Sequence, residues 1–456
     1  MLKQITSMLV FILLLSCSGE DDTVQDQTEE SPVFPGEIEF LKTIGGSEQD
    51  DFLSVVATQD GGAAAFGFTQ SNDGDITGKP TTDSDYWLVK FDENLNIEWQ
   101  SVFGGSNDDR GQDMAATSDG GFIVNGFSRS LDGVVSQNYG FQDYWVVKLD
   151  AGGNIQWEKS IGFSGNDRGY GITTTSEGGY YATGFLDVTA SGGEGNDDFS
   201  GSKNKFDQSL PKHGVGEFWG IHLSGSGETL RRRYFGGTNN DRSYAAIQTE
   251  DGGFIQVGHS ESDDFDITDP KGSYDVWVVK TSEDGDLDWQ QNFGGSSIEI
   301  GYDIIKTDGG NYLLVGDTRS TDKDVSNPRG SADVWIIKFD PEGELIWEKT
   351  YGGSDFESGR SIVALGNDEY FVTSSSQSLN AQLDFNYGMN DVWNFIINGN
   401  GELIWQKTTG GSQLDLGNDA ARNARGEIFV VGSSESKDND FLNNQGDKDA
   451  FIFKLN

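Results

Sequence analysis

Short apolar runs, separated by turns rich in Gly and Asp, recur along the chain. Between residues 111 and 162, GQDMAATS leads through DGG into FIVNGFS, and a long polar loop then leads to DYWVVKLD, AGG and NIQWEKSIG. Asp-Gly and Gly-Gly pairs supply the positive φ angles that tight hairpin turns need, and no stretch shows sustained helical periodicity. The pattern predicts four antiparallel strands in this stretch.

Two markers repeat along the chain and divide it into seven units. The first is a Gly pair (Gly-Phe at 162) that recurs every 58 or 59 residues, with one interval of 74. Its first glycines are Gly45, Gly104, Gly162, Gly236, Gly294, Gly352 and Gly410. The second marker is a hexapeptide similar to DYWVVK that begins at residues 85, 143, 217, 275, 333, 391 and 449. Four-stranded antiparallel units repeated around an axis form a β-propeller.

The two ends of the repeat array complete each other. The seventh unit stops after DAFIFKLN, without the strand that follows in the other units, and EIEFLKTIGG stands alone before the first unit. Joining them makes a whole blade and removes the open sheet edges of the ring. We therefore expect an all-β fold: a seven-bladed β-propeller of four-stranded antiparallel blades, closed by an N-terminal strand (a Velcro closure).

The beginning of the chain is typical of a bacterial export signal. Its apolar run, Met8 to Leu15, is too short to span a bilayer, and it ends in LLSC, which resembles the bacterial lipobox. The resemblance implies that Cys17, the only cysteine in the chain, is lipidated. We expect residues 1–16 to be a lipoprotein signal peptide, residues 17–36 an acidic flexible tether, and residues 37–456 the propeller.

The acidic residues after Cys17 resemble the surface-export signal of Bacteroidota lipoproteins. This resemblance implies an outer-membrane protein that is held only by its lipid anchor and faces the extracellular side. A solvated linker that faces the periplasm is the alternative.

Acidic residues recur at two positions of every unit. The first set, here called the first-strand acids, starts the innermost strand: Asp50, Asp109, Asp167, Asp241, Glu299, Glu357 and Asp415. The second set, the third-strand acids, starts the third strand: Asp85, Asp143, Glu217, Asp275, Asp333, Asp391 and Asp449. Strand alternation puts both sets on the face that also carries the long loops. A catalytic acid is needed once, so we interpret both sets as acceptors of turn N–H groups.

Four of the long loops begin with Ser-x-Asp-x-Asp. Their acids are Asp73, Asp75, Asp264, Asp266, Asp322, Asp324, Asp438 and Asp440. Oxygen ligands at alternate positions suit Ca²⁺, although the downstream bidentate Glu of an EF-hand is missing. Calcium loops and merely solvated loops both remain open at this point.

The chain has 75 acidic and 31 basic residues, which gives a net charge of −44. Nucleic acids and anionic membranes are therefore excluded as partners. We also expect sulfated or uronic polysaccharides to be repelled unless cations bridge them.

All eleven tryptophans stand at repeat positions, which predicts packing between blades. A binding platform must then come from loop aromatics such as Tyr139, Phe141, Phe385 and Tyr387. The three histidines form no metal cluster with Cys and no Ser-His-Asp order. We lean against an enzyme.

The third unit is longer than the others, and the excess falls at residues 191–213. This insertion is the candidate binding loop, because it mixes basic and aromatic residues on the variable face: Lys203, Lys205, Phe206, Lys212 and His213. A disordered insertion is the alternative.

Two resemblances to known families follow. The turns at Asp150–Trp157 and Asp340–Trp347 look like the tryptophan-docking turn of quinoprotein propellers, but the Ala and Thr of that motif and an adjacent Cys pair are missing. The whole unit is similar to repeat propellers of Bacteroidota surface proteins, a group without a general assigned activity.

The sequence therefore predicts a lipid-anchored binding or scaffold propeller on the cell surface. It would recognise an outer-membrane or secreted protein, or an extracellular polysaccharide, through its long-loop face. The alternative is a polysaccharide lyase or hydrolase with its site at the propeller mouth. A redox quinoprotein is the third hypothesis.

Overall fold

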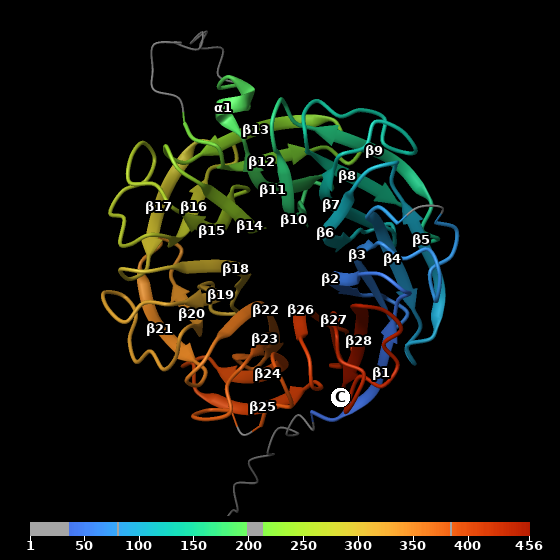
Figure 1. Ribbon diagram of the computed structural model, residues 1–456. Helices are drawn as coiled ribbons and strands as arrows, with labels where there is room; N and C mark the ends of the chain where they lie inside the picture. Colours follow the sequence, from blue (N-terminus) through green and yellow to red (C-terminus); the bar gives the residue numbers. More distant parts are fainter. Residues whose placement is uncertain (1–35, 80–81, 198–212, 384) are drawn as a thin grey trace, which may run out of the picture. The chain divides into compact units, whose positions relative to one another are not determined.

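The computed structural model describes residues 36–79, 82–197, 213–383 and 385–456. Residues 36–456 form one compact unit. It consists of seven four-stranded antiparallel sheets that stand around a common axis as blades (Figure 1). The predicted seven-bladed propeller is confirmed. Cys17 and the predicted signal peptide lie outside the described residues, as does the tether apart from Gly36.

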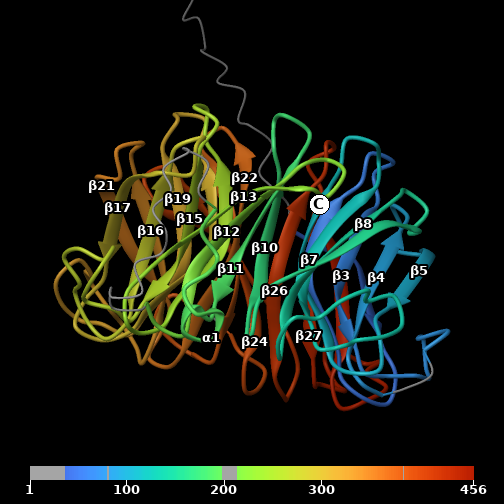
Figure 2. The same cartoon turned by 90° about the horizontal axis from the view of Figure 1, so that it is seen from above.

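Within each of the first six blades the strands run in chain order from the axis outward. They are β2 (Asp50–Ala57), β3 (Ala63–Thr69), β4 (Asp85–Phe91) and β5 (Ile97–Phe103); β6 (Asp109–Ala116), β7 (Phe122–Ser128), β8 (Asp143–Leu149) and β9 (Ile155–Ile161); β10 (Arg168–Thr174), β11 (Tyr180–Leu186), β12 (Glu217–Leu223) and β13 (Thr229–Phe235); β14 (Asp241–Gln248), β15 (Phe254–Ser260), β16 (Asp275–Thr281) and β17 (Leu287–Phe293); β18 (Glu299–Lys306), β19 (Tyr312–Thr318), β20 (Asp333–Phe339) and β21 (Leu345–Tyr351); β22 (Glu357–Gly366), β23 (Glu369–Ser376), β24 (Asp391–Asn398) and β25 (Leu403–Thr409). The seventh blade combines β26 (Asp415–Arg422), β27 (Ile428–Ser434), β28 (Asp449–Leu455) and, on its outside, β1 (Ile38–Ile44). Seen from the edge, the strands run between two faces of loops (Figure 2). The single described helix is the short α1 (Val188–Ser191).

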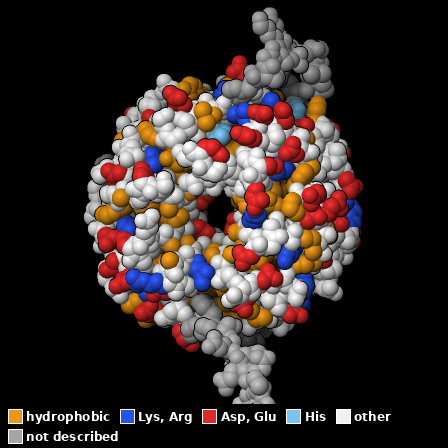
Figure 3. Space-filling model, turned by 180° about the vertical axis from the view of Figure 1, so that it is seen from behind, with side chains coloured by type: hydrophobic (Ala, Val, Ile, Leu, Met, Phe, Trp, Pro, Cys, Tyr) orange, Lys and Arg blue, Asp and Glu red, His pale blue; other side chains and the backbone are white. Residues whose placement is uncertain are grey.

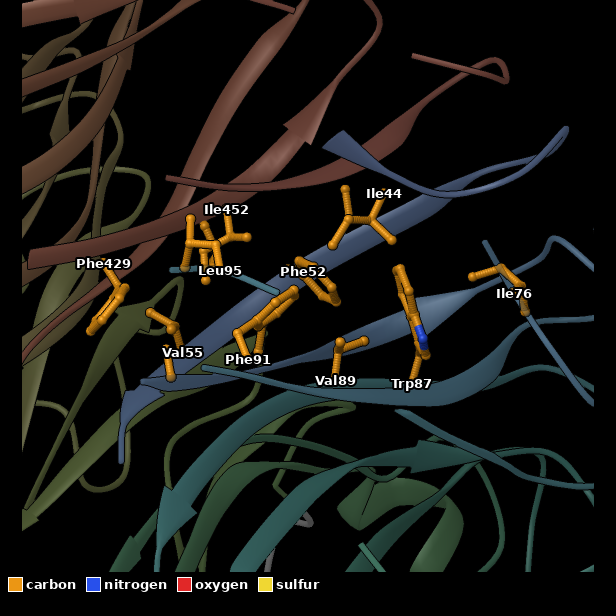
Figure 4. Packing of buried hydrophobic residues seen from close by; sticks show 14 residues of the cluster. Ile44, Phe52, Val55, Ile76, Trp87, Val89, Phe91, Leu95, Phe429 and Ile452 are labelled. Atoms are coloured by element: carbon orange, nitrogen blue, oxygen red, sulfur yellow. The ribbon is translucent and has the colours of Figure 1, made fainter. Parts of the chain in front are cut away.

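The first and last strands of the chain close the ring. β1 pairs antiparallel with β28, from Ile38 opposite Leu455 to Ile44 opposite Ala450. Side chains of the first and last blades, among them Phe52, Trp87 and Phe429, form one buried cluster across this junction (Figure 4). The predicted Velcro closure is confirmed.

The tryptophans join neighbouring blades in two ways. The six in the third strands are at most 1% exposed, and the Trp145 ring, for example, lies 4.5 Å from the ring of Tyr86 in the preceding blade. Those in the fourth strands lie against a glycine of the next blade: an added Cβ at Gly153 would come within 2.6 Å of Trp99. In the third blade Arg231 takes this place and lies against Gly285. The prediction of packing between blades is confirmed.

Each innermost strand bulges at the residue that stands three positions after its first-strand acid. The pairing register of β2 with β3 skips Leu53, and the register skips the corresponding residue in the other six blades. A bulge redirects the extra side chain. The seven bulged residues, one per blade, are Leu53, Gln112, Tyr170, Tyr244, Tyr302, Arg360 and Asn418.

Candidate binding site

On the long-loop face, the Gly pair of one blade junction lies against the long loop of the following unit. The Ser47 N–H donates to Asp73 Oδ1 at 2.8 Å, and the Glu48 N–H donates to Ser71 Oγ at 3.0 Å. Side-chain oxygens of the long loop therefore bind backbone N–H groups beside the Gly pair and hold the two segments together.

The first-strand acids are fully buried below the Gly pairs. Each accepts the N–H four residues earlier, at 2.6–2.8 Å. Asp109, for example, accepts hydrogen bonds from the Gly105 N–H at 2.7 Å and from the Ser130 hydroxyl at 2.9 Å. These carboxylates fix the connection between consecutive blades, and none of them reaches the surface.

The third-strand acids lie on the other side of the same glycines. Asp333 accepts the Arg329 N–H at 2.7 Å, Asp449 accepts the Gln445 N–H at 2.7 Å, and Asp85 pairs with Lys79 at 2.8 Å. Among the described residues, five of these acids keep one buried oxygen without a hydrogen-bond partner: Asp85, Asp143, Asp275, Asp333 and Asp391. All fourteen repeated acids are at most 5% exposed, so neither set presents a carboxylate to a partner.

Burial raises the pKa of many of these acids. The pKa of Asp167 rises to about 8, because of burial and, to a smaller extent, the nearby Asp143 carboxylate. The pKa of Asp391 rises to about 7 through burial, with Asp415 nearby. A folded-state pKa above the unfolded value means that the folded protein binds more protons, so stability is lost as pH rises through the folded pKa.

We expect the melting temperature to fall between about pH 7.5 and about pH 9. Below this window the three histidines act in the opposite direction, because burial lowers their pKa values in the folded protein, whereas the unfolded chain titrates them at about pH 6.5. Scanning calorimetry across the window tests the slope, and Asp167→Asn should flatten it.

Asp60→Asn is the matched control for the pH series. Burial raises the pKa of Asp60, but hydrogen bonds from Lys90 and Thr58 outweigh burial and bring it down to about 2. Asp60 therefore titrates outside the window. A melting temperature that rises with pH in the wild type would contradict the expectation.

The aspartates of the predicted calcium loops accept hydrogen bonds from backbone N–H groups. Asp73, Asp264, Asp322 and Asp438 each accept one loop N–H at 2.8–2.9 Å. Asp75, Asp266, Asp324 and Asp440 each accept the N–H of the first glycine at 3.0–3.3 Å. In the part of the chain that the structure describes, no three or more His, Cys, Asp or Glu side chains are grouped to hold a metal. Calcium at these loops stays a prediction.

Large apolar side chains are exposed on several of the long loops and are most numerous on two of them. In the second unit these are Leu131, 73% exposed, Val134, and the half-exposed Tyr139 and Phe141. In the sixth unit they are Leu379, Phe385, Tyr387 and Met389. The four aromatic residues were predicted from the sequence, and the other four are additional.

The insertion of the third unit is described only at its ends. Lys203, Lys205, Phe206 and Lys212 lie outside the described residues, so their role stays a prediction. His213 stacks on Phe265 with ring centroids 4.6 Å apart, and its Nδ1 lies 3.3 Å from Glu217 Oε2. It lines a hollow of about 260 Å³.

The centre of the ring holds a second hollow, of about 250 Å³, which the sequence did not indicate. All seven bulged residues line it, together with Asp113, Ala245, Asp303 and Asp419. Figure 3 shows the central opening between the side chains.

The described residues contain no helix long and apolar enough to cross a membrane.

No protein-family model and no curated protein matches the sequence. Solved structures with a similar fold include the Pan2 WD40 domain of Neurospora crassa, 9% identical over 91% of this chain and 95% of that one, with a TM-score of 0.47. The propeller domain of the Trilobed protease from Pyrococcus furiosus is 10% identical over 86% and 92%, with a TM-score of 0.43. A member of the DUF4221 family from Bacteroides vulgatus is 10% identical over 92% and 97%, with a TM-score of 0.38. Identities this low speak at most for the fold, and the sheet topology itself makes the chain a seven-bladed β-propeller.

Proposed function

We propose that this protein is a lipid-anchored binding or scaffold propeller of the cell surface, whose long-loop face recognises a protein or a glycan. The observation that carries the proposal is the exposure of aromatic and aliphatic side chains on the loops of the second and sixth units. The anchor at Cys17 and the outward orientation rest on the sequence of residues 1–36.

The exposed side chains have the composition of a recognition surface. Aromatic residues and Met are enriched at the centres of protein interfaces, and aromatic rings also stack on sugars. Arg129 lies over Phe141 at 4.3 Å, and Phe385 contacts Tyr387 with ring centroids 4.4 Å apart. These contacts hold the rings in place before a partner arrives, which lowers the entropy cost of binding.

Two double variants test this face: Tyr139→Ser with Phe141→Ser, and Phe385→Ser with Tyr387→Ser. We expect at least one of them to reduce capture by about tenfold or more. The measurement is retention of detergent-solubilised outer-membrane proteins and of soluble plant and algal polysaccharides on the immobilised protein.

Ile346→Ser is the matched control, since Ile346 is 47% exposed on the outer strand β21, away from the loops. It should retain partners as the wild type does. Retention by both double variants equal to that of the wild type would refute the proposed face.

The polysaccharide lyase or hydrolase remains the alternative proposal. Its acid or base cannot come from the repeated acids, because they are buried. His259 is 5% exposed, its ring centroid lies 5.6 Å from that of Tyr244, and burial lowers its pKa to about 3. The geometry therefore supports binding better than catalysis.

A further inference from the structure

The central hollow has walls that differ in chemistry around the ring. At about 250 Å³ it is smaller than the roughly 300–1,000 Å³ of sites for drug-sized ligands. A ligand held there is therefore a small molecule or the end unit of a longer one.

One wall is an arc of three tyrosines from consecutive blades. The rings of Tyr170 and Tyr244 lie 5.0 Å apart, and those of Tyr244 and Tyr302 lie 5.2 Å apart. All three side chains are partly buried and line the hollow. They offer a continuous aromatic surface to an occupant.

The remaining wall is mostly polar. The Arg360 guanidinium lies 4.0 Å above the Tyr302 ring, and among the described residues it forms no ion pair with a carboxylate. Gln112, Asn418 and the apolar Leu53 line the same wall. Arg360 offers donors and Gln112 offers both donors and an acceptor, whereas Asn418 already donates its two Nδ2 hydrogens to acceptors of the first blade and offers its amide oxygen.

Three carboxyl groups also line the hollow, and each holds the neighbouring blade. Asp113 accepts the Ile172 N–H at 2.7 Å, Asp303 accepts the Ile362 N–H at 2.9 Å, and Asp419 accepts the Val55 N–H at 2.8 Å. Each also accepts the N–H of the residue that follows it, at 2.7 Å, and Asp113 accepts a Ser hydroxyl as well. Of the about four lone-pair sites of a carboxylate, about one on each therefore stays free for an occupant.

The charges around the hollow select the class of ligand. A cation would suit the tyrosines and carboxylates but would meet Arg360, whereas an anion would suit Arg360 but would meet three carboxyl groups. A neutral molecule with several hydroxyls and one apolar face matches both walls. We propose that the central channel binds a neutral saccharide unit of about the size of one hexose, stacked on Tyr170, Tyr244 and Tyr302.

This site is separate from the long-loop face and does not depend on the proposed function. Its test is saturation-transfer NMR, followed by calorimetry, on the purified full-length protein with glucose, galactose, mannose and xylose. We expect binding of at least one of these sugars. Glucuronate and glucosamine, the charged analogues, should bind more weakly than the best neutral sugar.

Two tyrosine variants and one control variant test whether the sugar binds in the central channel. Tyr244→Ala should weaken sugar binding about tenfold, the value of a lost aromatic contact, and Tyr170→Ala provides the same test if Tyr244→Ala does not fold. Tyr139→Ala, on the long-loop face, should leave sugar binding unchanged.

Three results would overturn the channel site: no transfer to any of the four sugars, tighter binding of a charged analogue, or wild-type affinity in a folded tyrosine variant. Loss of sugar binding in Tyr139→Ala alone would place the sugar on the loop face instead. Failure of the partner-capture experiment would leave the channel site untouched, so the two proposals fail separately.

Discussion

A chain that begins at Gly45, and so lacks β1, will lose most of its folding stability and will aggregate. β28 then has an unpaired outer edge, and such edges pair with other chains. The deletion also removes Ile44, which is completely buried in the cluster between the first and last blades. Loss of one buried Ile costs about 2–5 kcal/mol, against a typical total of about 5–15 kcal/mol. Thermal melting and light scattering measure both effects.

A chain that begins at Gly36 is the control for this deletion. It keeps every described contact, including the hydrogen bond from the Gly36 N–H to the Asn456 carbonyl oxygen at 2.9 Å. Its melting temperature should equal that of the full-length protein. A synthetic peptide of residues 36–46 should restore part of the lost melting temperature. An unchanged melting temperature in the shorter chain would show that β1 does not hold the ring closed.

Gly104→Ala will be a costly conservative substitution at a blade junction. An added Cβ would lie 2.0 Å from Asp85 Oδ1 and 2.7 Å from Asp109 Oδ2. Neither carboxylate can move freely, because Lys79 holds the first and the Gly105 N–H and two Ser hydroxyls hold the second. Overpacking of this kind costs about 1–3 kcal/mol, and we expect the upper end.

Gly309→Ala is the comparison for this substitution. Its added Cβ would have only Thr307 Oγ1 nearby, at 3.9 Å, so we expect a change within about 0.5 kcal/mol. Denaturant unfolding of both variants gives the two free energies. Equal losses at Gly104 and Gly309 would mean that the carboxylates do not confine the Gly pair.

The blade number and the closure could be read from the sequence because they depend on repetition. Each of the first six blades forms from one contiguous unit, so the Gly pairs and the third-strand hexapeptides mark its boundaries directly. The incomplete seventh unit and the solitary first strand then had to pair. The positions of the repeated acids were visible for the same reason.

The channel could not be read in this way, because its lining does not repeat. The bulge turns one residue of each innermost strand toward the axis, and this residue changes from Leu53 to Gln112 to Tyr170 in consecutive blades. One signal was present: Tyr170, Tyr244 and Tyr302 each stand three residues after a first-strand acid. Strict alternation along a strand hid it, since a bulge breaks that alternation.

The three acids that directly follow a bulged residue could not be recognised from the sequence either. Asp113, Asp303 and Asp419 bind the backbone of the next blade, but only three of the seven units carry an acid at this position. A search for residues common to all units passes over them. The contact became visible only when neighbouring blades were placed side by side.

The pairing of β1 with β28 also sets an order of events during biosynthesis. Blades one to six consist of neighbouring segments and can form while the chain is still emerging. The strand that closes the circle is made first, whereas its partner is made last, so β1 must wait for nearly the whole polypeptide. Completion of the ring is therefore a late, long-range encounter, and such contacts form more slowly than hairpins.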